Sequence, residues 1–356
     1  MKRAWSFKEI IAILVSIVFF AAVYVVIYLI MPVSGENRWK EVEIPQGSSY
    51  SKGIDTLAGK GFVKNKLIFL AMGRLTGTDR TMKGGFYNLN TAMTPLEIFD
   101  RLRKGMIVEY TVTIPEGSTL DDIKNKLKEI GLINDSSWQI VKDSSFIDSL
   151  DIKAPSLEGY IFPDSYNFAK GTDPKYIFSI MIQRLREKYN EPLLKRTYEL
   201  GMTVNEVLTL ASIIEKEAVY DSERPIISAV YHNRLKRNMK LQADPTVLYG
   251  VRYRWGRVMY SDLLRVTPYN TYVIKGLPPG PIASPGLKSI RAALYPAKTG
   301  YLFFVSMNNG RHHFSYSGQE HVKAVALYRR NNNTNEENKT DEDNKTKEDS
   351  QAKETN

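Results

Sequence analysis

Residues 44–63 read IPQGSSYSKGIDTLAGKGFV, and residues 114–133 read IPEGSTLDDIKNKLKEIGLI. The two stretches begin seventy residues apart and align without a gap, so an internal duplication is the simplest account of them. Each copy predicts a strand, an I-P-x-G-S turn, a helix with apolar positions such as Ile123, Leu127 and Ile130, and a glycine that ends the helix. Each copy is therefore a small βα unit.

The chain around the two copies predicts how the units are completed. After the first copy, the pattern indicates a helix near 67–75, a strand at 84–87 and a helix at 95–103. Residues 32–108 then form one βααβ-type module. Residues 109–156 hold the second unit and a polar connector of loops or short helices.

An apolar segment precedes the module. Residues 10–31 contain no charge, and one helix of that length spans a bilayer. A cleaved signal peptide is the alternative, but its apolar part would be shorter and would end in a small-residue cleavage site, which does not follow Ile30. Lys2, Arg3 and Lys8 precede the span, so the positive-inside rule makes residues 1–9 a cytoplasmic tail and places the rest outside the cell membrane.

Composition narrows the function classes. The chain has no cysteine, which excludes disulfides, thiolate zinc sites and a cysteine nucleophile. Residues 331–356 carry 4 Lys against 8 Asp and Glu, and they lack the apolar side chains needed to fold, so we expect a disordered acidic tail. The remaining chain carries the larger basic excess, which suits an anionic partner. Its Lys and Arg are scattered and match no nucleic-acid-binding signature, so we expect no nucleic acid.

One helix brings two carboxylates close together in the sequence. Residues 203–206 read TVNE, which has the form of a capping box, and apolar positions then recur at helical spacing up to Ile214. Glu215 and Glu217 follow near the end of this helix, about 200° apart around its axis. Both lie at the edge of the apolar stripe, so periodicity does not choose between them, and two solvated charges are the simpler interpretation of this helix alone.

The surrounding loops mix rigid turns, aromatic rings, amides and carboxylates. Sugar-binding clefts need that mixture, because rings pack on pyranose C–H faces while hydroxyl groups need fixed hydrogen-bond partners. The segments are LEGYIFPDSY at 157–166, NRL at 233–235, LQADPT at 241–246, YNTY at 269–272 and GLPPGPIASPG at 276–286.

Taken with ASIIEKE at 211–217 and EHVKAVALY at 320–328, these segments resemble the signatures of the YceG-like endolytic murein transglycosylases (MltG). The resemblance runs from the apolar segment to about residue 330. It implies an α+β fold with an N-terminal transmembrane helix, a LysM-like βααβ module at 32–108, and a YceG-like catalytic domain at 157–330. The catalytic domain would carry a lysozyme-like glutamate helix, on which the family's catalytic acid falls at Glu217.

The family reaction breaks the MurNAc–GlcNAc linkage of glycan strands and leaves a 1,6-anhydro end without using water. One carboxyl can make both proton transfers. We therefore expect Glu217 to be the general acid and base, with its pKa raised by an apolar wall. The candidates for orienting the sugar and stabilising the transition state are Glu158, Gln242, Asp244, Tyr269, Asn270 and Tyr272.

No cofactor or metal is expected. The four histidines, at 232, 312, 313 and 321, form no metal-binding spacing, and a rim hydrogen-bonding role is the default for the last three. The expected partners are peptidoglycan strands, the cytoplasmic membrane and membrane-bound peptidoglycan synthases. Two alternatives remain open: a non-enzymatic scaffold that binds cell-wall glycan, and a muramidase that uses water with Glu158 or Asp244 as its second carboxylate.

Overall fold

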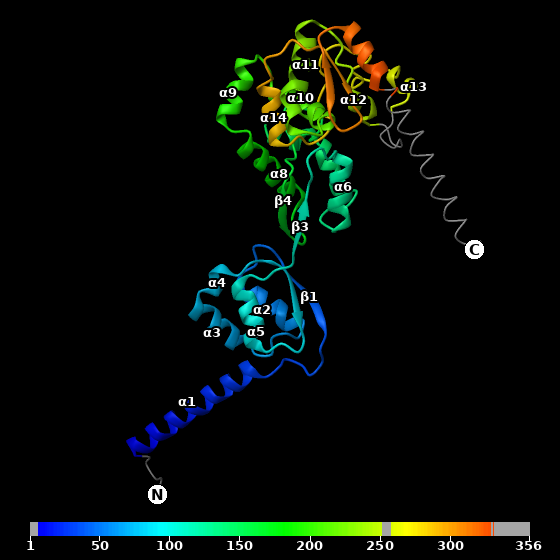
Figure 1. The fold of residues 1–356 in the computed structure, drawn as a ribbon. Coiled ribbons are helices and arrows are strands. Elements are labelled where there is room, and N and C mark those ends of the chain that lie inside the picture. Colours follow the sequence, from blue (N-terminus) through cyan, green and yellow to red (C-terminus); the bar gives the residue numbers. More distant parts are fainter. Residues whose placement is uncertain (1–5, 251–257, 329, 331–356) are drawn as a thin grey trace, which may run out of the picture. The chain divides into compact units, whose positions relative to one another are not determined.

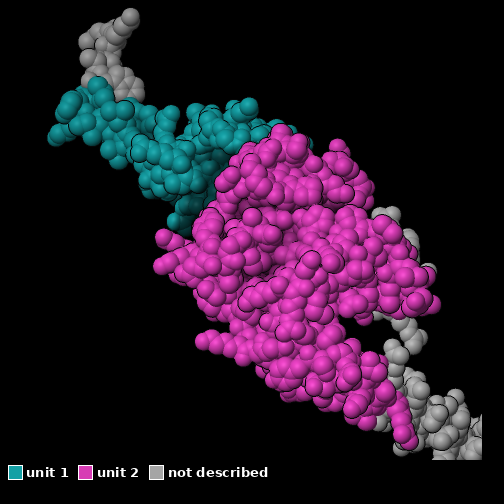
Figure 2. Space-filling view, turned by 90° about the horizontal axis from the view of Figure 1, so that it is seen from above, with its two compact units in different colours: residues 1–111, 167–173 teal, residues 112–166, 174–356 magenta. Residues whose placement is uncertain are grey.

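The computed structural model describes residues 6–250, 258–328 and 330. The chain divides into two compact units, which Figure 2 colours separately. Unit 1 comprises residues 1–111 and 167–173, and unit 2 comprises residues 112–166 and 174–356. The expected acidic tail at 331–356 lies outside the described residues, as does most of the expected cytoplasmic tail. Helices and short strands alternate along the described chain, so the α+β class is confirmed.

Unit 1 begins with the long apolar helix α1, drawn dark blue in Figure 1. Along the chain, the elements of unit 1 are α1 (Phe7–Ile30), β1 (Trp39–Ile44), α2 (Tyr50–Gly59), α3 (Lys66–Thr76), α4 (Thr78–Thr81), β2 (Gly85–Asn90) and α5 (Pro95–Lys104). Helix α1 is long and apolar enough to cross a membrane, and none of its residues is buried.

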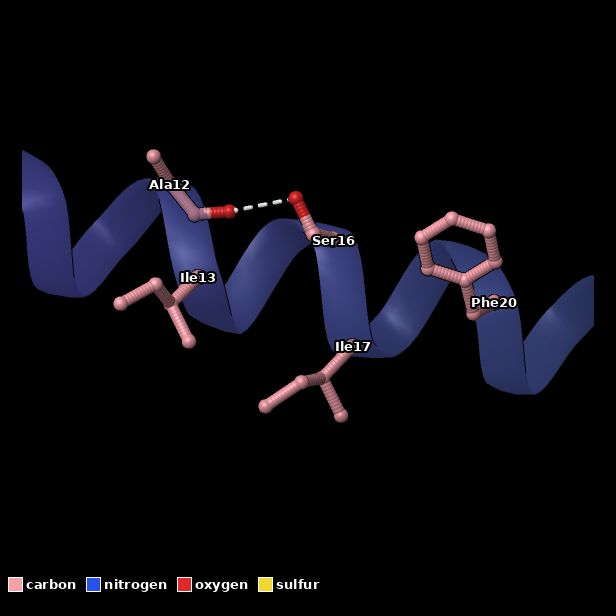
Figure 3. Close-up of a pocket in the computed structure, with 5 residues that line it drawn as sticks. All are labelled: Ala12, Ile13, Ser16, Ile17 and Phe20. Atoms are coloured by element: carbon pink, nitrogen blue, oxygen red, sulfur yellow. Dashed lines mark hydrogen bonds between the residues drawn. The ribbon is translucent and has the colours of Figure 1, made fainter.

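The single polar side chain in the middle of α1 is satisfied within the helix. Figure 3 shows the Ser16 hydroxyl donating to the Ala12 carbonyl, at 2.9 Å. Such a local bond lets a serine lie in a hydrocarbon environment without an unpaired donor. The hollow beside it is lined by Ala12, Ile13, Ser16, Ile17 and Phe20. It contains no ionisable group and is no candidate for chemistry.

The module of unit 1 packs its helices on a two-stranded antiparallel sheet. Strand β1 pairs with β2 from Trp39–Asn90 to Ile44–Gly85. The inward side chains of the sheet and the helices α2, α3 and α5 form one core, which contains Ile44, Leu57, Phe69, Tyr87 and Leu102. The expected βααβ order is present, with the short helix α4 added and α5 closing the module.

Both copies of the repeat fold in the same way. The turn glycines Gly47 and Gly117 have φ of 73° and 75°, a left-handed conformation that glycine adopts without strain. Ser49 and Thr119 then cap α2 and α6 (Leu120–Glu129) through their side-chain oxygens. The second copy, however, belongs to unit 2, whereas the first belongs to unit 1.

Unit 2 holds the remaining elements, apart from the portions of two strands that belong to unit 1. Strand β3 (Glu109–Thr113) pairs with β4 (Ser165–Ala169), and the division between the units falls within both strands. The other elements are η1 (Ser137–Lys142), α7 (Ser144–Ser149), α8 (Pro174–Lys188), α9 (Glu191–Glu199), α10 (Val204–Glu217), η2 (Asp221–Glu223), α11 (Arg224–Lys236), α12 (Asp244–Leu248), α13 (Tyr260–Leu263), α14 (Leu287–Leu294), β5 (Phe303–Ser306) and β6 (His312–Ser315). Residues 318–328 are also helical. Helix α10 lies at the centre, against α11 and α14 (Figure 1).

Candidate active site

Helix α10 carries both glutamates of the E-K-E motif at its C-terminal end. It begins with the expected capping box: the N–H of Thr203 donates to the Glu206 carboxylate at 2.8 Å, and the N–H of Glu206 donates to the Thr203 hydroxyl at 3.2 Å. Residues 207–214 are all buried. The packing of this long apolar stretch fixes the direction in which each glutamate leaves the helix.

Glu215 is committed to a structural ion pair. Its carboxylate lies 3.0 Å from the guanidinium of Arg224 and accepts the N–H of Gly286 at 2.9 Å. The two charged side chains are 6% and 8% exposed, so each needs the other for compensation. Glu215 therefore holds α10 to α11 and to the start of α14.

Glu217 has a different environment. It is the last residue of α10, and its carboxylate accepts a hydrogen bond from the hydroxyl of the buried Tyr231 at 3.2 Å. Its side chain lines a cavity of about 430 Å³, within the usual size of ligand sites. The structure thus separates two glutamates that the sequence pattern left equivalent.

The surroundings of Glu217 favour its protonated form. Burial is the largest cause and the negative charge of Asp244 is the second, and together they raise the pKa of Glu217 to about 7. The Tyr231 hydroxyl and the charge of Arg234 act in the opposite direction. A carboxyl with such a pKa can give and take a proton near neutrality, as general acid–base catalysis requires.

The cavity gathers side chains from several parts of unit 2. They come from α10, α11, the start of α12, β5, β6, the helical segment 318–328 and the loops that hold residues 241–242, 272 and 308. The lining residues are Glu217, Arg234, Leu241, Gln242, Asp244, Tyr272, Phe304, Val305, Ser306, Asn308, His312, His321, Val325 and Tyr328. Most of the lining groups are polar, which suits a ligand rich in hydroxyl groups.

Four of the candidate residues from the sequence meet in this cavity: Glu217, Gln242, Asp244 and Tyr272. The Tyr272 hydroxyl donates to the Asp244 carboxylate at 2.5 Å, which fixes that second carboxylate beside the cavity. Gln242 has a φ of 49°, unusual for a residue with a side chain, and its N–H donates to the Thr271 carbonyl at 3.1 Å. The 241–246 and 269–272 loops therefore hold each other in place.

Arg234 is a cavity residue that the sequence pattern does not single out, although it belongs to the NRL segment at 233–235. Its guanidinium is buried and donates to the carbonyls of Leu302 and Leu241, both at 2.6 Å. It also lies over the Phe303 ring, 5.1 Å from the centroid. Arg234 thus joins β5 to the 241–242 loop and brings positive charge to the cavity.

His312 is a second unselected cavity residue with a fixed orientation. Its Nδ1 lies 2.8 Å from the carboxylate of the buried Glu223, and its backbone N–H donates to the same carboxylate at 3.1 Å. A histidine held through one ring nitrogen presents the other in a defined direction. For His312 the sequence predicts only hydrogen bonds at the rim of the cleft. The structure in addition fixes its ring orientation through Glu223.

The other three candidates, Glu158, Tyr269 and Asn270, do not line the Glu217 cavity. Asn270 is buried, and its amide donates to the carbonyls of Asp262, Leu263 and Arg265 at 3.2, 3.1 and 2.7 Å. These bonds tie the side chain to the end of α13 and to the segment that follows it. Asn270 therefore shapes the YNTY segment and offers little to a ligand.

Glu158 lies in a different cavity, of about 470 Å³, which the Tyr249 side chain also lines. Its carboxylate accepts the Leu120 N–H at 3.1 Å and the Tyr249 hydroxyl at 3.1 Å. Burial raises the pKa of Glu158 to about 7. The Tyr269 ring packs against the Tyr249 ring at an angle of 45°, with ring centroids 4.6 Å apart. Glu158 therefore supports the second copy of the repeat at the start of α6, and neither Glu158 nor Tyr269 lines the Glu217 cavity.

Among the described residues, no group of three or more His, Asp or Glu side chains is arranged to hold a metal ion. A protonatable carboxyl at the wall of a polar cavity is the arrangement that cleavage of a glycosidic bond by general acid catalysis requires. The chain belongs to the YceG-like family, whose sequence model matches residues 42–327.

Named relatives support this assignment. The endolytic murein transglycosylase of Bacillus subtilis (strain 168) is 35% identical over 323 residues, which cover 84% of this chain and 88% of the relative. The endolytic murein transglycosylase of Streptococcus pneumoniae serotype 2 (strain D39 / NCTC 7466) is 30% identical over 355 residues, covering 90% of this chain and 64% of that longer relative. The crystal structure of a YceG-like protein from Listeria monocytogenes matches 80% of this chain and 98% of its own, with 34% identity and a TM-score of 0.55.

Proposed function

We propose that the chain is an endolytic murein transglycosylase, which cleaves the MurNAc–GlcNAc linkage within peptidoglycan strands and forms 1,6-anhydro-MurNAc ends. The observation that carries the proposal is Glu217, a carboxyl whose pKa is raised to about 7 at the wall of a polar cavity. The reaction needs one group that is protonated before bond cleavage and ionised after it, and this pKa permits both states near neutrality.

Glu217 acts twice in this mechanism. As a general acid, it donates its proton to the glycosidic oxygen as the bond to C1 of the muramic acid breaks. As a general base, the resulting carboxylate takes the proton of the C6 hydroxyl of the same sugar, and that oxygen bonds to C1. The carboxyl recovers its proton, the leaving sugar gains one, and no water is consumed.

Asp244 and Tyr272 stabilise the positive charge that develops on the sugar between the two proton transfers. Bond cleavage leaves oxocarbenium-like positive charge on the muramic acid ring. The Asp244 carboxylate is fixed by Tyr272 on the same cavity wall and supplies a negative charge there. Gln242 and His312 line the cavity and provide directed hydrogen bonds for the sugar substituents.

The same pair of carboxylates supports a second candidate function, a muramidase that hydrolyses the linkage. Glu217 and Asp244 would then be the acid and the second carboxylate of an ordinary glycosidase. Asp244 is a better second carboxylate than Glu158, because Asp244 lines the same cavity as Glu217, whereas Glu158 lines a different one. The two functions differ in their products, since hydrolysis leaves a reducing end.

The N-terminal part gives the reaction its place in the cell. Helix α1 anchors the chain in the cytoplasmic membrane, with the N-terminus in the cytoplasm and residues after 32 outside. The module at 32–108 is LysM-like and contacts glycan. Peptidoglycan synthases in the same membrane are the partners that deliver nascent strands.

The test is mass spectrometry of uncrosslinked nascent strands after incubation with the full chain in detergent, beside its Glu217→Gln variant. We expect anhydro-muramic ends from the native chain and roughly a hundredfold to ten-thousandfold fewer from the variant, because glutamine cannot transfer the proton. Glu187→Gln is the matched control, since Glu187 is a half-exposed helix residue outside the cavity.

Each outcome separates the alternatives. Reducing ends from the native chain would replace the transglycosylase with the muramidase. Anhydro ends that survive in Glu217→Gln would remove Glu217 from the reaction. If neither substrate cleavage nor a difference between the variants were seen while the chain still bound glycan, the non-enzymatic scaffold would explain the structure better.

A further inference from the structure

Helix α1 joins the module of unit 1 without a free linker. The helix ends at Ile30, and three residues later Val33 is already part of the module core, with 7% of its surface exposed. The N–H of Val33 donates to the Met93 carbonyl at 3.0 Å, and the N–H of Ser34 donates to the Thr91 carbonyl at 2.9 Å. The chain leaving α1 is thus bonded to the loop that leads into α5.

The last turns of α1 also contact the module directly. The Tyr28 hydroxyl accepts the N–H of Asn65, the N-cap of α3, at 3.1 Å. Tyr24 and Tyr28 stack with ring centroids 6.5 Å apart. A hollow of about 230 Å³ is lined by Tyr24, Ile27, Tyr28, Met31, Pro32, Val33, Lys64 and Pro95. The N-terminal ends of α3 and α5 therefore lie beside the end of α1, as Figure 1 shows for α5.

Each of these two helix ends carries an exposed leucine. Leu67, the second residue of α3, is 76% exposed, and Leu96, the second residue of α5, is 48% exposed. Helical side chains lean toward the N-terminus of their helix, so both leucines lean toward the end of α1. Lys64 is exposed beside them. An apolar pair with a neighbouring cation is the composition of a membrane-surface contact.

The length of α1 sets the level of these leucines relative to a bilayer. Glu9 is the last charged residue of the helix, and Tyr28 follows it by nineteen residues, a rise of about 28 Å. The hydrocarbon core is about 30 Å thick. When Glu9 lies at one boundary, Tyr28 lies at the other, where tyrosine is the favoured residue. Asn65 is bonded to Tyr28, so Leu67 starts at the same level.

We propose that the module of unit 1 docks on the outer surface of the bilayer, with Leu67 and Leu96 inserted at the boundary between head groups and acyl chains. The inference rests on the proposed membrane anchorage of α1 and extends it, because the anchor alone requires no contact between module and lipid. The partner is the lipid surface itself, which is continuous with the surface that surrounds α1.

The absence of cysteine allows single fluorophores to be placed without other changes. Leu67→Cys, Leu96→Cys, Leu75→Cys and Val18→Cys variants of the full chain are labelled with an environment-sensitive NBD group and reconstituted into phosphatidylcholine–phosphatidylglycerol vesicles. Leu75 is the matched control, a leucine 87% exposed at the far end of α3, about 12 Å along the helix from Leu67. Val18 marks the bilayer centre.

Quenching by lipids with doxyl groups at shallow and deep positions reports the depth of each label. We expect Leu67 and Leu96 labels to be quenched at least threefold more than the Leu75 label, and most strongly by the shallow quencher. A Val18 label quenched by the deep lipid, with Leu67 and Leu96 labels no different from Leu75, would refute docking and leave the anchor intact, pointing to a protein partner for the leucines. An unquenched Val18 label would overturn both anchorage and docking.

Discussion

The pKa of Glu217 depends on two neighbours that can be altered without changing the size of the side chain. Tyr231→Phe removes the hydroxyl that donates to the carboxylate at 3.2 Å, and Asp244→Asn removes the negative charge that faces it. The hydrogen bond favours the ionised form and the neighbouring charge disfavours it. The two variants are therefore expected to move the pKa of Glu217 in opposite directions.

The size of each shift follows from the contacts. At its present pKa of about 7, Glu217 is half protonated at pH 7, whereas a carboxyl at 4.5 would be protonated in roughly one molecule in 300. A hydrogen bond to a charged group contributes about 1.5 kcal/mol at its weaker end, which suits a 3.2 Å bond and corresponds to about one pKa unit. The Asp244 charge contributes on the order of one unit in the other direction.

The assay is the pH dependence of kcat/KM on nascent strands between pH 5 and 9. A general acid loses activity as the pH rises through its pKa, so the alkaline limb reports Glu217 in the free enzyme. We expect that limb to move up by about one unit in Tyr231→Phe and down by about one unit in Asp244→Asn. Tyr198→Phe, at an exposed tyrosine, is the control that leaves the limb unmoved.

The position of the limb is the readout, because Asp244→Asn also lowers the rate at every pH. Limbs that stay within a few tenths of a unit of the native value in both variants would show that another group is titrated. Shifts in the same direction would show that the hydroxyl and the carboxylate do not act on Glu217 as the geometry indicates.

Two further predictions concern stability. Glu215→Ala leaves the buried Arg224 with the exposed Asp221 as its ion-pair partner and with the Ser289 hydroxyl. We expect a loss of about 3 kcal/mol in the free energy of unfolding by denaturant, with anhydro ends still formed by the folded fraction. An unchanged unfolding midpoint would contradict the structural role of Glu215. Glu158 has a folded-state pKa of about 7 against 4.5 for a free carboxyl, so the folded state holds more protons between these values and its stability falls as the pH rises through this window. The free energy of unfolding changes by at most about 1.4 kcal/mol per pH unit for each such acid. Glu158→Gln removes the contribution of Glu158 to this pH dependence. If the thermal unfolding profiles of the native chain and the variant stayed parallel from pH 4 to 8, the raised pKa of Glu158 would be contradicted.

Much of the fold follows from local sequence signals. The I-P-x-G-S turns, the serine and threonine caps and the terminal glycines define α2 and α6, and the structure has both helices where the pattern places them. These signals are local, so one sequence suffices to find them. The assignment of the second repeat to unit 2 depends on contacts distant in sequence, such as the bond between Glu158 and the Leu120 N–H.

The sequence predicts some residues of the candidate site correctly and misplaces others. The cavity residues Gln242, Asp244 and Tyr272 stand in segments whose composition already indicated a cleft. Glu158 and Asn270 stand in segments of the same kind, yet their side chains bond to backbone within unit 2. A polar residue in a loop motif can serve the ligand or the loop, and only the direction of its hydrogen bonds distinguishes these roles.

The two copies of the repeat show how one local structure came to serve different purposes. In the first copy, a Cβ at Gly47 would meet nothing within 4 Å, so this glycine faces open space. In the second, the N–H of Gly117 donates to the Ser284 carbonyl at 2.8 Å, and the Lys216 ammonium donates to the Gly117 carbonyl at 3.3 Å. Lys216 lies between Glu215 and Glu217 in α10. The bond between Lys216 and Gly117 therefore attaches the second turn to the end of the helix that carries Glu217. The second turn therefore supplies support of the kind that a preorganised acid, the role proposed for Glu217, requires.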